Sequence, residues 1–370
     1  MRVTPAAALF AVVVSLLGCK RAASSTSTTS STSSAAPSAS GASDGPRVPP
    51  RPAPNATPRV VRTSNVACAL YTDGALYCRD LRALSAKALA ADDGESGFFR
   101  VDGLGALRTF DVGPLLGVAV REDGDVIAWP ESPQVLTERF EPKPTRACEV
   151  HDAVDVSVSS AEAAAILTRT GKIFKWKVGR LVPGCGAPAI ATGIEDAVSV
   201  SCGFTLCCAA HRTGLVSCFP PSDDDRGRMV RIPDLSGVVE VSVGQFEALA
   251  RDRAGRVRSF SPSSYFVPTA MPNLPDGGRG RVLAPEGRPS EPFAELDGAA
   301  GLSPGGCGLD KKGTAVCTRG SAGSKSLAAL GDGLRQLAVS QSAPCALDAS
   351  NKVVCAVERE GRFERVAVVP

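Results

Sequence analysis

Short apolar alternations recur along this chain and predict β-strands. Residues 154–158, 198–202 and 239–243 place an apolar side chain at every second position, and residues 337–339 form a shorter apolar run. A period of two is typical of a half-buried strand, and no long segment shows the 3.6-residue period of an amphipathic helix. We therefore expect an all-β domain over residues 59–370.

A hairpin motif follows several of these runs and occurs seven times. The first copy turns through Thr72, Asp73 and Gly74. Three-residue loops usually end in a left-handed residue, a conformation open to glycine and tolerated by asparagine. A repeat of about 46 residues without helices predicts a seven-bladed β-propeller with about four strands per blade. The reference positions are Gly74, Gly124, Gly171, Gly214, Gly255, Gly313 and Asn351.

Four of the seven hairpins carry a pair of cysteines at the same two positions. These positions lie opposite each other across the strands, where Cβ atoms are about 4.5–5.5 Å apart, close to the disulfide range of about 3.5–4.5 Å. We expect four disulfides; the alternative is eight free buried cysteines. The pairs are Cys68 and Cys78, Cys208 and Cys218, Cys307 and Cys317, and Cys345 and Cys355.

The N-terminus indicates export. Residues 6–17 are apolar apart from Ser15, and the run is too short to span a bilayer as a helix of ~20 residues. It ends in Leu16-Leu17-Gly18-Cys19, which resembles the lipobox of bacterial lipoproteins. The resemblance implies a signal peptide over residues 1–18 and a diacylated, palmitate-bearing Cys19 as the mature N-terminus. An ordinary secretory signal is the alternative.

Residues 19–58 comprise Cys19 and a segment rich in Ser, Thr, Ala and Pro. Such a composition has too little apolar content to fold, so we expect a disordered tether. Lys20 resembles the residue that follows the lipidated cysteine in outer-membrane lipoproteins. We therefore expect an exported protein whose N-terminal lipid holds it in the bacterial cell envelope, at the outer membrane.

The four remaining cysteines are Cys148, Cys185, Cys202 and Cys207. An even remainder in an exported chain suggests two further disulfides, with Cys148–Cys185 and Cys202–Cys207 as the preferred pairing. The alternative is a metal site formed by Cys202, Cys207, Cys208 and His211, because zinc takes such ligands at short spacings. An oxidising compartment favours disulfides.

The hairpin itself resembles the regulator of chromosome condensation repeat. The resemblance rests on a cysteine-alanine-leucine phrase, a three-residue loop ending in glycine, and a strand ending in cysteine and an aromatic residue. It implies a closed propeller that acts as a protein-interaction platform, and extracellular bacterial members often carry the same cysteine pair. The family's histidine and Trp-Gly pair are absent. Matching positions are the aromatic residues Trp129, Trp176, Phe219 and Phe260 and the glycines Gly113, Gly203 and Gly244.

Charge and side-chain chemistry exclude several functions. The chain has 41 basic and 38 acidic residues without a basic stripe interleaved with aromatics, so we expect no nucleic-acid partner. It has two histidines, His151 and His211, and no Gly-x-Ser-x-Gly elbow, so nucleophilic catalysis has little support. The acidic run 223–225 is interpreted as a solvated loop. We expect neither a cofactor nor a metal.

Two insertions offer candidate binding residues, because long loops on a rigid scaffold often carry function. Residues 84–104 contain Phe98 and Phe99, and residues 262–292 contain Tyr265 and Phe266. Exposed aromatic residues of this kind anchor protein partners. We therefore expect a non-catalytic, lipid-anchored protein-binding module with an unidentified envelope partner. The alternatives are an envelope hydrolase or lyase with carboxylates at the channel mouth, or a purely structural surface head.

The two ends of the predicted domain must meet for the ring to close. Residues 59–62 indicate an initial strand and residues 363–369 a final one. We expect both strands in or beside the same blade, so that the ring has no exposed edge. Removing the last eight residues should then unfold the domain.

Overall fold

The computed structural model describes most of the chain beyond residue 50, and every element below belongs to the compact unit Val48–Pro370. Cys19, the signal peptide and the tether up to residue 50 lie outside the described residues. The described ranges are 51–81, 98–130, 144–159, 163–178, 184–221, 229–270, 279–283, 288–318, 324–339, 343–359 and 362–369.

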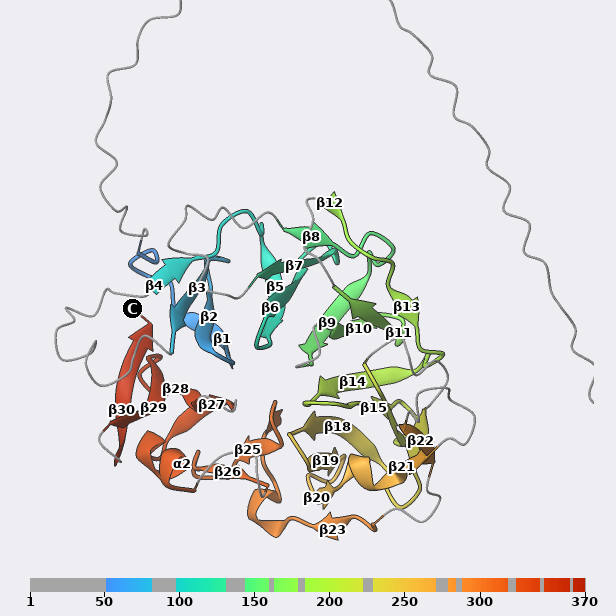
Figure 1. The fold of residues 1–370 in the computed structure, drawn as a ribbon. Coiled ribbons are helices and arrows are strands. Elements are labelled where there is room, and N and C mark those ends of the chain that lie inside the picture. The colour runs from blue at the N-terminus through green and yellow to red at the C-terminus, as the bar shows by residue number, and fades with distance from the viewer. Residues whose placement is uncertain are drawn as a thin grey trace, which may run out of the picture. The chain divides into compact units, whose positions relative to one another are not determined.

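Seven antiparallel sheets stand around a central channel and form an all-β, seven-bladed propeller (Figure 1). Within each blade the strands run outward in chain order. We number the blades 1 to 7 along the chain. The innermost strands are β1 (Pro58–Thr63), β5 (Leu107–Val112), β9 (Ala153–Val158), β14 (Ala197–Cys202), β18 (Val238–Val243), β24 (Leu302–Ser303) and β27 (Leu334–Ala338).

The second and third strands of each blade form the repeated hairpin. The second strands are β2 (Val66–Tyr71), β6 (Leu116–Arg121), β10 (Ala163–Thr168), β15 (Cys207–His211), β19 (Ala248–Asp252), β25 (Cys307–Leu309) and β28 (Cys345–Asp348). The third strands are β3 (Leu76–Asp80), β7 (Val126–Pro130), β11 (Ile173–Lys177), β16 (Val216–Phe219), β20 (Val257–Phe260), β26 (Ala315–Cys317) and β29 (Val353–Arg359).

The outer positions vary more. Outer strands are β4 (Phe98–Arg100), β8 (Thr145–Arg146), β13 (Ile190–Ala191), β17 (Val230–Ile232), β23 (Glu291–Pro292) and β30 (Arg362–Val369). After β26 of blade 6 the described chain forms the helix α2 (Ser324–Leu330). Additional elements are β12 (Gly184–Cys185), the hairpin β21 (Phe266–Ala270) and β22 (Arg279–Leu283), and the 3₁₀ turns η4 (Pro262–Tyr265) and η5 (Ala294–Leu296).

Every repeated hairpin turns through a residue with positive φ, as the sequence predicted. The φ angles are 82° at Gly74, 95° at Gly171 and 60° at Asn351, and the other four reference glycines lie between 75° and 90°. Asn351 is the one non-glycine residue with positive φ among the described residues. These turns form one face of the disc, which we call the turn face.

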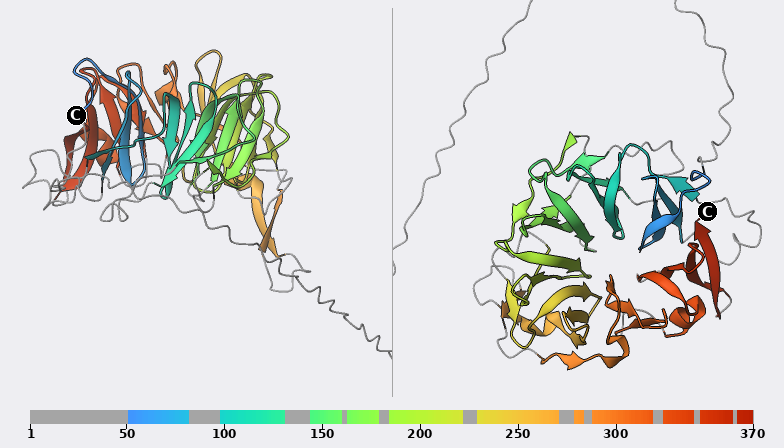
Figure 2. Two further views of the ribbon diagram at one scale, coloured as in Figure 1. Left: turned by 90° about the horizontal axis from the view of Figure 1, so that it is seen from above. Right: turned by 180° about the vertical axis from the view of Figure 1, so that it is seen from behind.

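The opposite face is formed by the turns that join the first strand of each blade to the second; we call it the mouth face. Antiparallel connectivity also places the chain between third and fourth strands on this side. Seen edge-on, the hairpin β21–β22 projects from the disc (Figure 2). It follows η4, and Ser261 Oγ at the start of this insertion donates a hydrogen bond to the carbonyl of Phe246 on the mouth face (3.4 Å).

The core lies between blades. A typical cluster combines Ala165 and Leu167 of blade 3 with Val200 and Ala209 of blade 4. Both faces of each central strand are therefore covered, and all six residues of β2 are buried. This arrangement explains why apolar runs interrupt the simple alternation of the sequence.

The ring closes by packing between blades 7 and 1. The sequence predicts the two terminal strands in or beside the same blade, and the second alternative holds: β1 is the innermost strand of blade 1, while β30 is the outermost strand of blade 7 and contacts β2 and β3 of blade 1. Each strand completes its own sheet. The two blades meet through a cluster that includes Val61, Leu347 and Val368, and the backbone N–H of Val61 donates to Gln336 Oε1 at 3.0 Å.

Candidate functional site

The hairpin cysteines lie directly opposite each other and form disulfides at the four expected pairs: Cys68–Cys78, Cys208–Cys218, Cys307–Cys317 and Cys345–Cys355. Each pair has a Cα–Cα distance of 4.0 Å. The bridges join the second and third strands of blades 1, 4, 6 and 7. They strengthen the framework, and their sulfurs are unavailable for nucleophilic chemistry.

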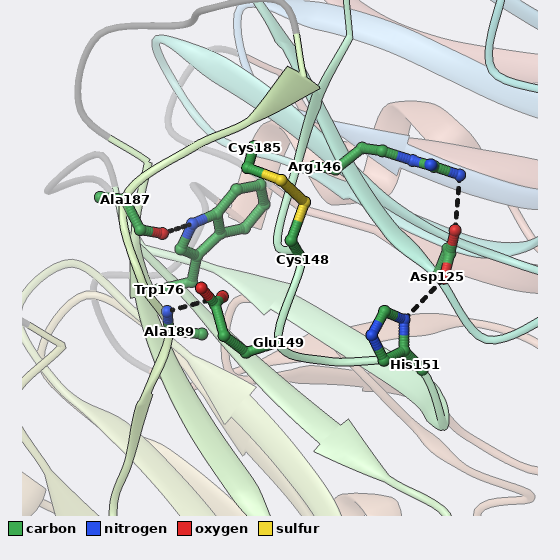
Figure 3. Close-up of a disulfide and its surroundings, with 9 residues drawn as sticks. All are labelled: Asp125, Arg146, Cys148, Glu149, His151, Trp176, Cys185, Ala187 and Ala189. Atoms are coloured by element: carbon green, nitrogen blue, oxygen red, sulfur yellow. Dashed lines mark hydrogen bonds and ion pairs between the residues drawn. A yellow bond between two sulfur atoms is a disulfide. The ribbon is translucent and has the colours of Figure 1, made fainter.

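The disulfide Cys148–Cys185 joins two blades (Figure 3). Cys185 belongs to β12, which follows β11 of blade 3 but pairs in parallel with β8 of blade 2. Trp176 Nε1 donates to the carbonyl of Ala187 at 2.9 Å and holds the crossing segment. A Cβ on Gly186 would approach Thr145 Cγ2 to 2.7 Å, so glycine permits the close passage.

The remaining disulfide, Cys202–Cys207, links β14 to β15 across a mouth-face turn. Since Cys202, Cys207 and Cys208 are all bonded to other cysteines, the alternative zinc site with His211 does not form. Among the described residues, no cluster of three His, Cys, Asp or Glu side chains could hold a metal ion.

A cavity of about 200 Å³ lies at the mouth-face end of the channel. All seven blades contribute to its wall at the end of the innermost strand, through residues 63–65, 111–114, 158, 202–204, 243–245, 304–305 and 339. Two glycines of the mouth-face turns allow neighbouring blades to approach each other at this cavity. A Cβ on Gly203 would lie 2.1 Å from the carbonyl oxygen of Gly244, and one on Gly113 would lie 2.6 Å from Val158 Cγ1.

Three large apolar side chains stand exposed on the mouth-face turns, and one of them, Phe204, lines the cavity. They are Leu115, Phe204 and Phe246, which are 51%, 47% and 59% exposed and belong to the mouth-face turns of blades 2, 4 and 5. Within the described mouth-face turns, Glu247 is the one charged residue. Aromatic enrichment with depleted charge characterises the centre of a protein interface. We call these three side chains the apolar rim.

The rim was not among the residues expected from sequence. An available signal was the apolar or aromatic residue placed one or two positions after the repeat glycine, as in Gly203-Phe204 and Gly113-Pro114-Leu115. A turn usually carries polar residues there. Exposure, however, depends on how neighbouring blades pack, and the turn sequence alone does not reveal it.

Polar side chains occupy most of the third and fifth positions of the innermost strands and build the channel wall; the exceptions are Val60 in β1 and Ala338 in β27. Each such strand is a sheet edge whose inward N–H groups need acceptors, and the preceding blade in the ring supplies them. This ladder fixes the register between blades. The acceptors are Asp111 Oδ2 for Val158 N–H (2.7 Å), Ser157 Oγ for Cys202 (2.9 Å), Ser201 Oγ for Val243 (3.0 Å), Ser242 Oγ for Gly306 (2.9 Å) and Glu240 Oε1 for Leu302 (3.0 Å).

Two carboxylates and one guanidinium meet on the side of blades 1 to 3. Arg62 Nε lies 3.7 Å from Asp111 Oδ1, with only 17% and 10% of the two side chains exposed. Burial raises the pKa of Asp111, while Arg62 and hydrogen bonds from the N–H groups of Val158 and Val112 oppose the rise. Burial also raises the pKa of Asp155 to about 6, against the opposing charge of Arg62.

A Ser–His–Asp chain occurs elsewhere, within blade 4, where His211 lies in β15, Ser217 in β16 and Asp196 directly before β14. His211 Nδ1 lies 2.5 Å from Asp196 Oδ1, and Nε2 lies 2.9 Å from Ser217 Oγ. The connectivity is that of a catalytic triad, but the order of burial is reversed. Ser217 is 5% exposed, whereas the Asp196 side chain is 43% exposed. A nucleophile must meet its substrate, so we interpret this chain as a structural contact that ties the first three strands of blade 4 together. The other histidine, His151, contacts Asp125 at 3.2 Å (Figure 3).

The four aromatic residues expected to bind a partner lie in two regions, β4 of blade 1 and the insertion that follows β20 of blade 5. Phe99 in β4 is half-buried and packs against the core between blades 1 and 2, which withdraws it from a docking surface. The backbones of Phe98, Tyr265 and Phe266 belong to β4, η4 and β21. Their side chains lie outside the described part of the structure.

No protein-family model and no curated protein matches this chain. Solved propellers resemble it at low identity. Yeast RCC1 (Prp20) bound to Kap60 gives a TM-score of 0.43 at 11% identity, over 80% of this chain and 69% of that one. Prp20p of Saccharomyces cerevisiae gives 0.44 at 12%, over 83% and 76%. PorZ, a surface component of the type-IX secretion system of Porphyromonas gingivalis, gives 0.48 at 9%, over 85% and 38%.

These likenesses are too distant to assign a function, and the propeller assignment rests on the sheet order of this chain. In the part of the chain that the structure describes, no helix is long and apolar enough to cross a membrane.

Proposed function

We propose that this protein is an exported, lipid-anchored propeller that binds another cell-envelope protein through its channel mouth without catalysis. The observation that carries the proposal is the apolar rim of Leu115, Phe204 and Phe246, exposed on the same face as a cavity that all seven blades line and that Phe204 itself contacts. Large apolar side chains exposed beside a cavity are typical of an interaction site.

The framework supports this role. Six disulfides and interblade packing hold the rim on a preformed scaffold, and a preorganised surface loses little entropy on binding. Disulfides persist outside the cytosol, in agreement with the lipobox-like sequence at Cys19. The regulator of chromosome condensation resemblance also implies a protein-interaction platform.

A second candidate is a hydrolase or lyase that uses channel carboxylates. Asp111 and Asp155 favour it, because burial raises the pKa of both groups, as in enzymes that use carboxylic acids near neutral pH. However, Asp111 accepts three hydrogen bonds and pairs with Arg62, which leaves it poorly placed to exchange protons with a substrate. Activity on ester or polysaccharide substrates that Asp155→Asn abolishes would favour this candidate over the binding module.

Crosslinking from one blade tests the binding module directly. A photoreactive phenylalanine analogue replaces Phe246 on the mouth face or, as the control, Ala254 on the turn face. The two exposed positions flank the same strand, β19. In cells of the native host we expect discrete crosslinked species from position 246 and none from position 254. The same crosslinked species from both positions, or none from either, would contradict the proposal and favour a purely structural role.

The anchor has its own test. Cys19→Ser should move the protein from the membrane fraction to the soluble fraction, and mass spectrometry of the wild type should find lipid on Cys19. Membrane retention of the Cys19→Ser protein would refute lipid anchoring without bearing on the rim.

A further inference from the structure

The charge distribution beneath the apolar rim is uneven. Blades 1 to 3 contribute Arg62, Asp111 and Asp155 from the innermost strands β1, β5 and β9. The two carboxylates exceed the one guanidinium, so this side carries one net negative charge when both acids are ionised. Asp111 itself lines the cavity.

The described channel residues of blades 4 and 5 carry no net charge. Blade 4 contributes Ser199 and Ser201 at the equivalent positions, and in blade 5 Glu240 Oε2 lies 2.7 Å from Arg251 Nε. The cations Arg59 and Arg108 lie beside Glu122 at the turn face, where they cannot balance the acids. Among the described channel residues of blades 1 to 5, the excess negative charge therefore lies on the side of blades 1 to 3.

The rim and the charge together define what fits the mouth. Apolar side chains on the mouth face favour an apolar segment, and Glu247 is the one charged residue among the described mouth-face turns. Inside, a cation gains from the net negative wall in a partly dry environment, where charge interactions are stronger than in water. An anion would face repulsion there.

We propose that the docking segment of the partner is a protein loop with a lysine or arginine at its tip, flanked by apolar side chains. The flanking side chains contact Leu115, Phe204 and Phe246, and the cation enters the cavity toward Asp111 and Asp155. This inference rests on the proposed function and adds the chemistry of the partner to it.

An unbiased selection tests the inference. A phage library of randomised cyclic heptapeptides is selected on the full chain carrying Cys19→Ser, with the variant Leu115→Asp/Phe246→Asp used for counter-selection. Intact disulfides and an unchanged circular dichroism spectrum establish that the variant is folded. We expect enriched loops with one basic residue between apolar residues.

The channel charge is tested with the enriched peptides. Replacing the basic residue by norleucine should weaken binding about fivefold or more, as expected for a partly buried charge pair. On Asp155→Asn this difference between the peptides should shrink, while Asp332→Asn on the distant turn face should leave it unchanged. Loops without a basic residue, loops with an acidic tip, or no enrichment that depends on the rim would overturn the inference.

The two proposals fail in distinguishable ways. Crosslinks from position 246, combined with enriched loops that lack a basic residue, would support the protein-binding module and refute the basic residue at the tip of the partner's loop. Crosslinks that are absent from both positions, or equal at positions 246 and 254, would refute the protein-binding module itself.

Discussion

The turn face and the mouth face of this propeller are built by different rules. On the turn face all seven blades repeat one three-residue turn whose last residue has positive φ. On the mouth face the turns differ in length and composition, and three of them expose a large apolar side chain. The comparison indicates that the repeat specifies the scaffold from one face and leaves the other available for recognition.

The hydrogen bonds of the two faces also differ. On the turn face, Asp310 Oδ1 accepts from the N–H groups of Lys312 and Thr314 within one turn, both at 2.8 Å, and the backbone carbonyl of Gly313 accepts from the N–H of Leu334 in the next blade at 3.0 Å. The bond from Thr314 is the main reason that the pKa of Asp310 lies below its ordinary value. Bonds near the mouth run between blades, as from Val243 to Ser201. Both faces therefore contribute to the joints between blades, the turn face through backbone carbonyls of the repeated turn and the mouth ladder through side chains that differ from blade to blade.

Removing residues 363–370 should have the largest effect on stability. It deletes most of β30 and takes Val368 from the core between blades 7 and 1. We expect the loss of cooperative thermal unfolding by circular dichroism. A melting temperature equal to that of the full chain would contradict closure through this contact.

Gly203→Ala should have the next largest effect. The new Cβ would lie 2.1 Å from the carbonyl oxygen of Gly244, so the two mouth turns must separate, at a cost of about 3 kcal/mol. Gly301→Ala is the matched control, since its nearest neighbour would be Glu240 Oε1 at 3.5 Å. Equilibrium unfolding in urea measures the free energy of unfolding of both variants. An equal loss of stability in the two would show that the close packing of blades 4 and 5 is unimportant.

Asp155 makes stability depend on pH. Its pKa of about 6 is raised by burial, so between about pH 4 and pH 6 the folded state binds more protons than the unfolded state. Stability should rise by about 1 kcal/mol as pH falls from 7.5 to 5. The buried acid beside it, Asp111, has a raised pKa as well and acts in the same direction, while Arg62 opposes both shifts.

The variant Asp155→Asn isolates this contribution. Its urea midpoint should change less between pH 7.5 and pH 5 than that of the wild type. An identical change in both proteins would show that Asp155 ionises normally in the folded state.

Phe246→Ala should have the smallest effect on stability, within about 0.5 kcal/mol, because its side chain is mostly exposed. Its effect on partner binding should be much larger. A strong loss of stability would make the rim a structural element and would remove the contrast between the two faces.

The sequence predicts the scaffold because the scaffold depends on local chemistry. Gly74 and Asn351 mark the same turn wherever they occur, and two cysteines placed symmetrically about it must face each other. The even number of remaining cysteines predicts two further bridges, with Cys148–Cys185 as the preferred pairing, but it does not predict that β12 passes to the neighbouring blade.

The candidate site depends on relations between blades, which no short segment contains. Phe99 resembles an exposed aromatic in the sequence, yet it packs against a core completed by blade 2. Phe204 looks like an ordinary hairpin residue, yet it stands at the channel mouth. Arg62, Asp111 and Asp155 are distant in sequence and meet only when the ring is assembled.

The most direct measurement is the yield of partner crosslinks from the two ends of β19 in the native envelope. If the mouth is the recognition face, position 246 captures a defined protein whose yield falls with Leu115→Asp, while position 254 captures none. Capture of the same proteins from both positions, unaffected by Leu115→Asp, would contradict a recognition role for the mouth.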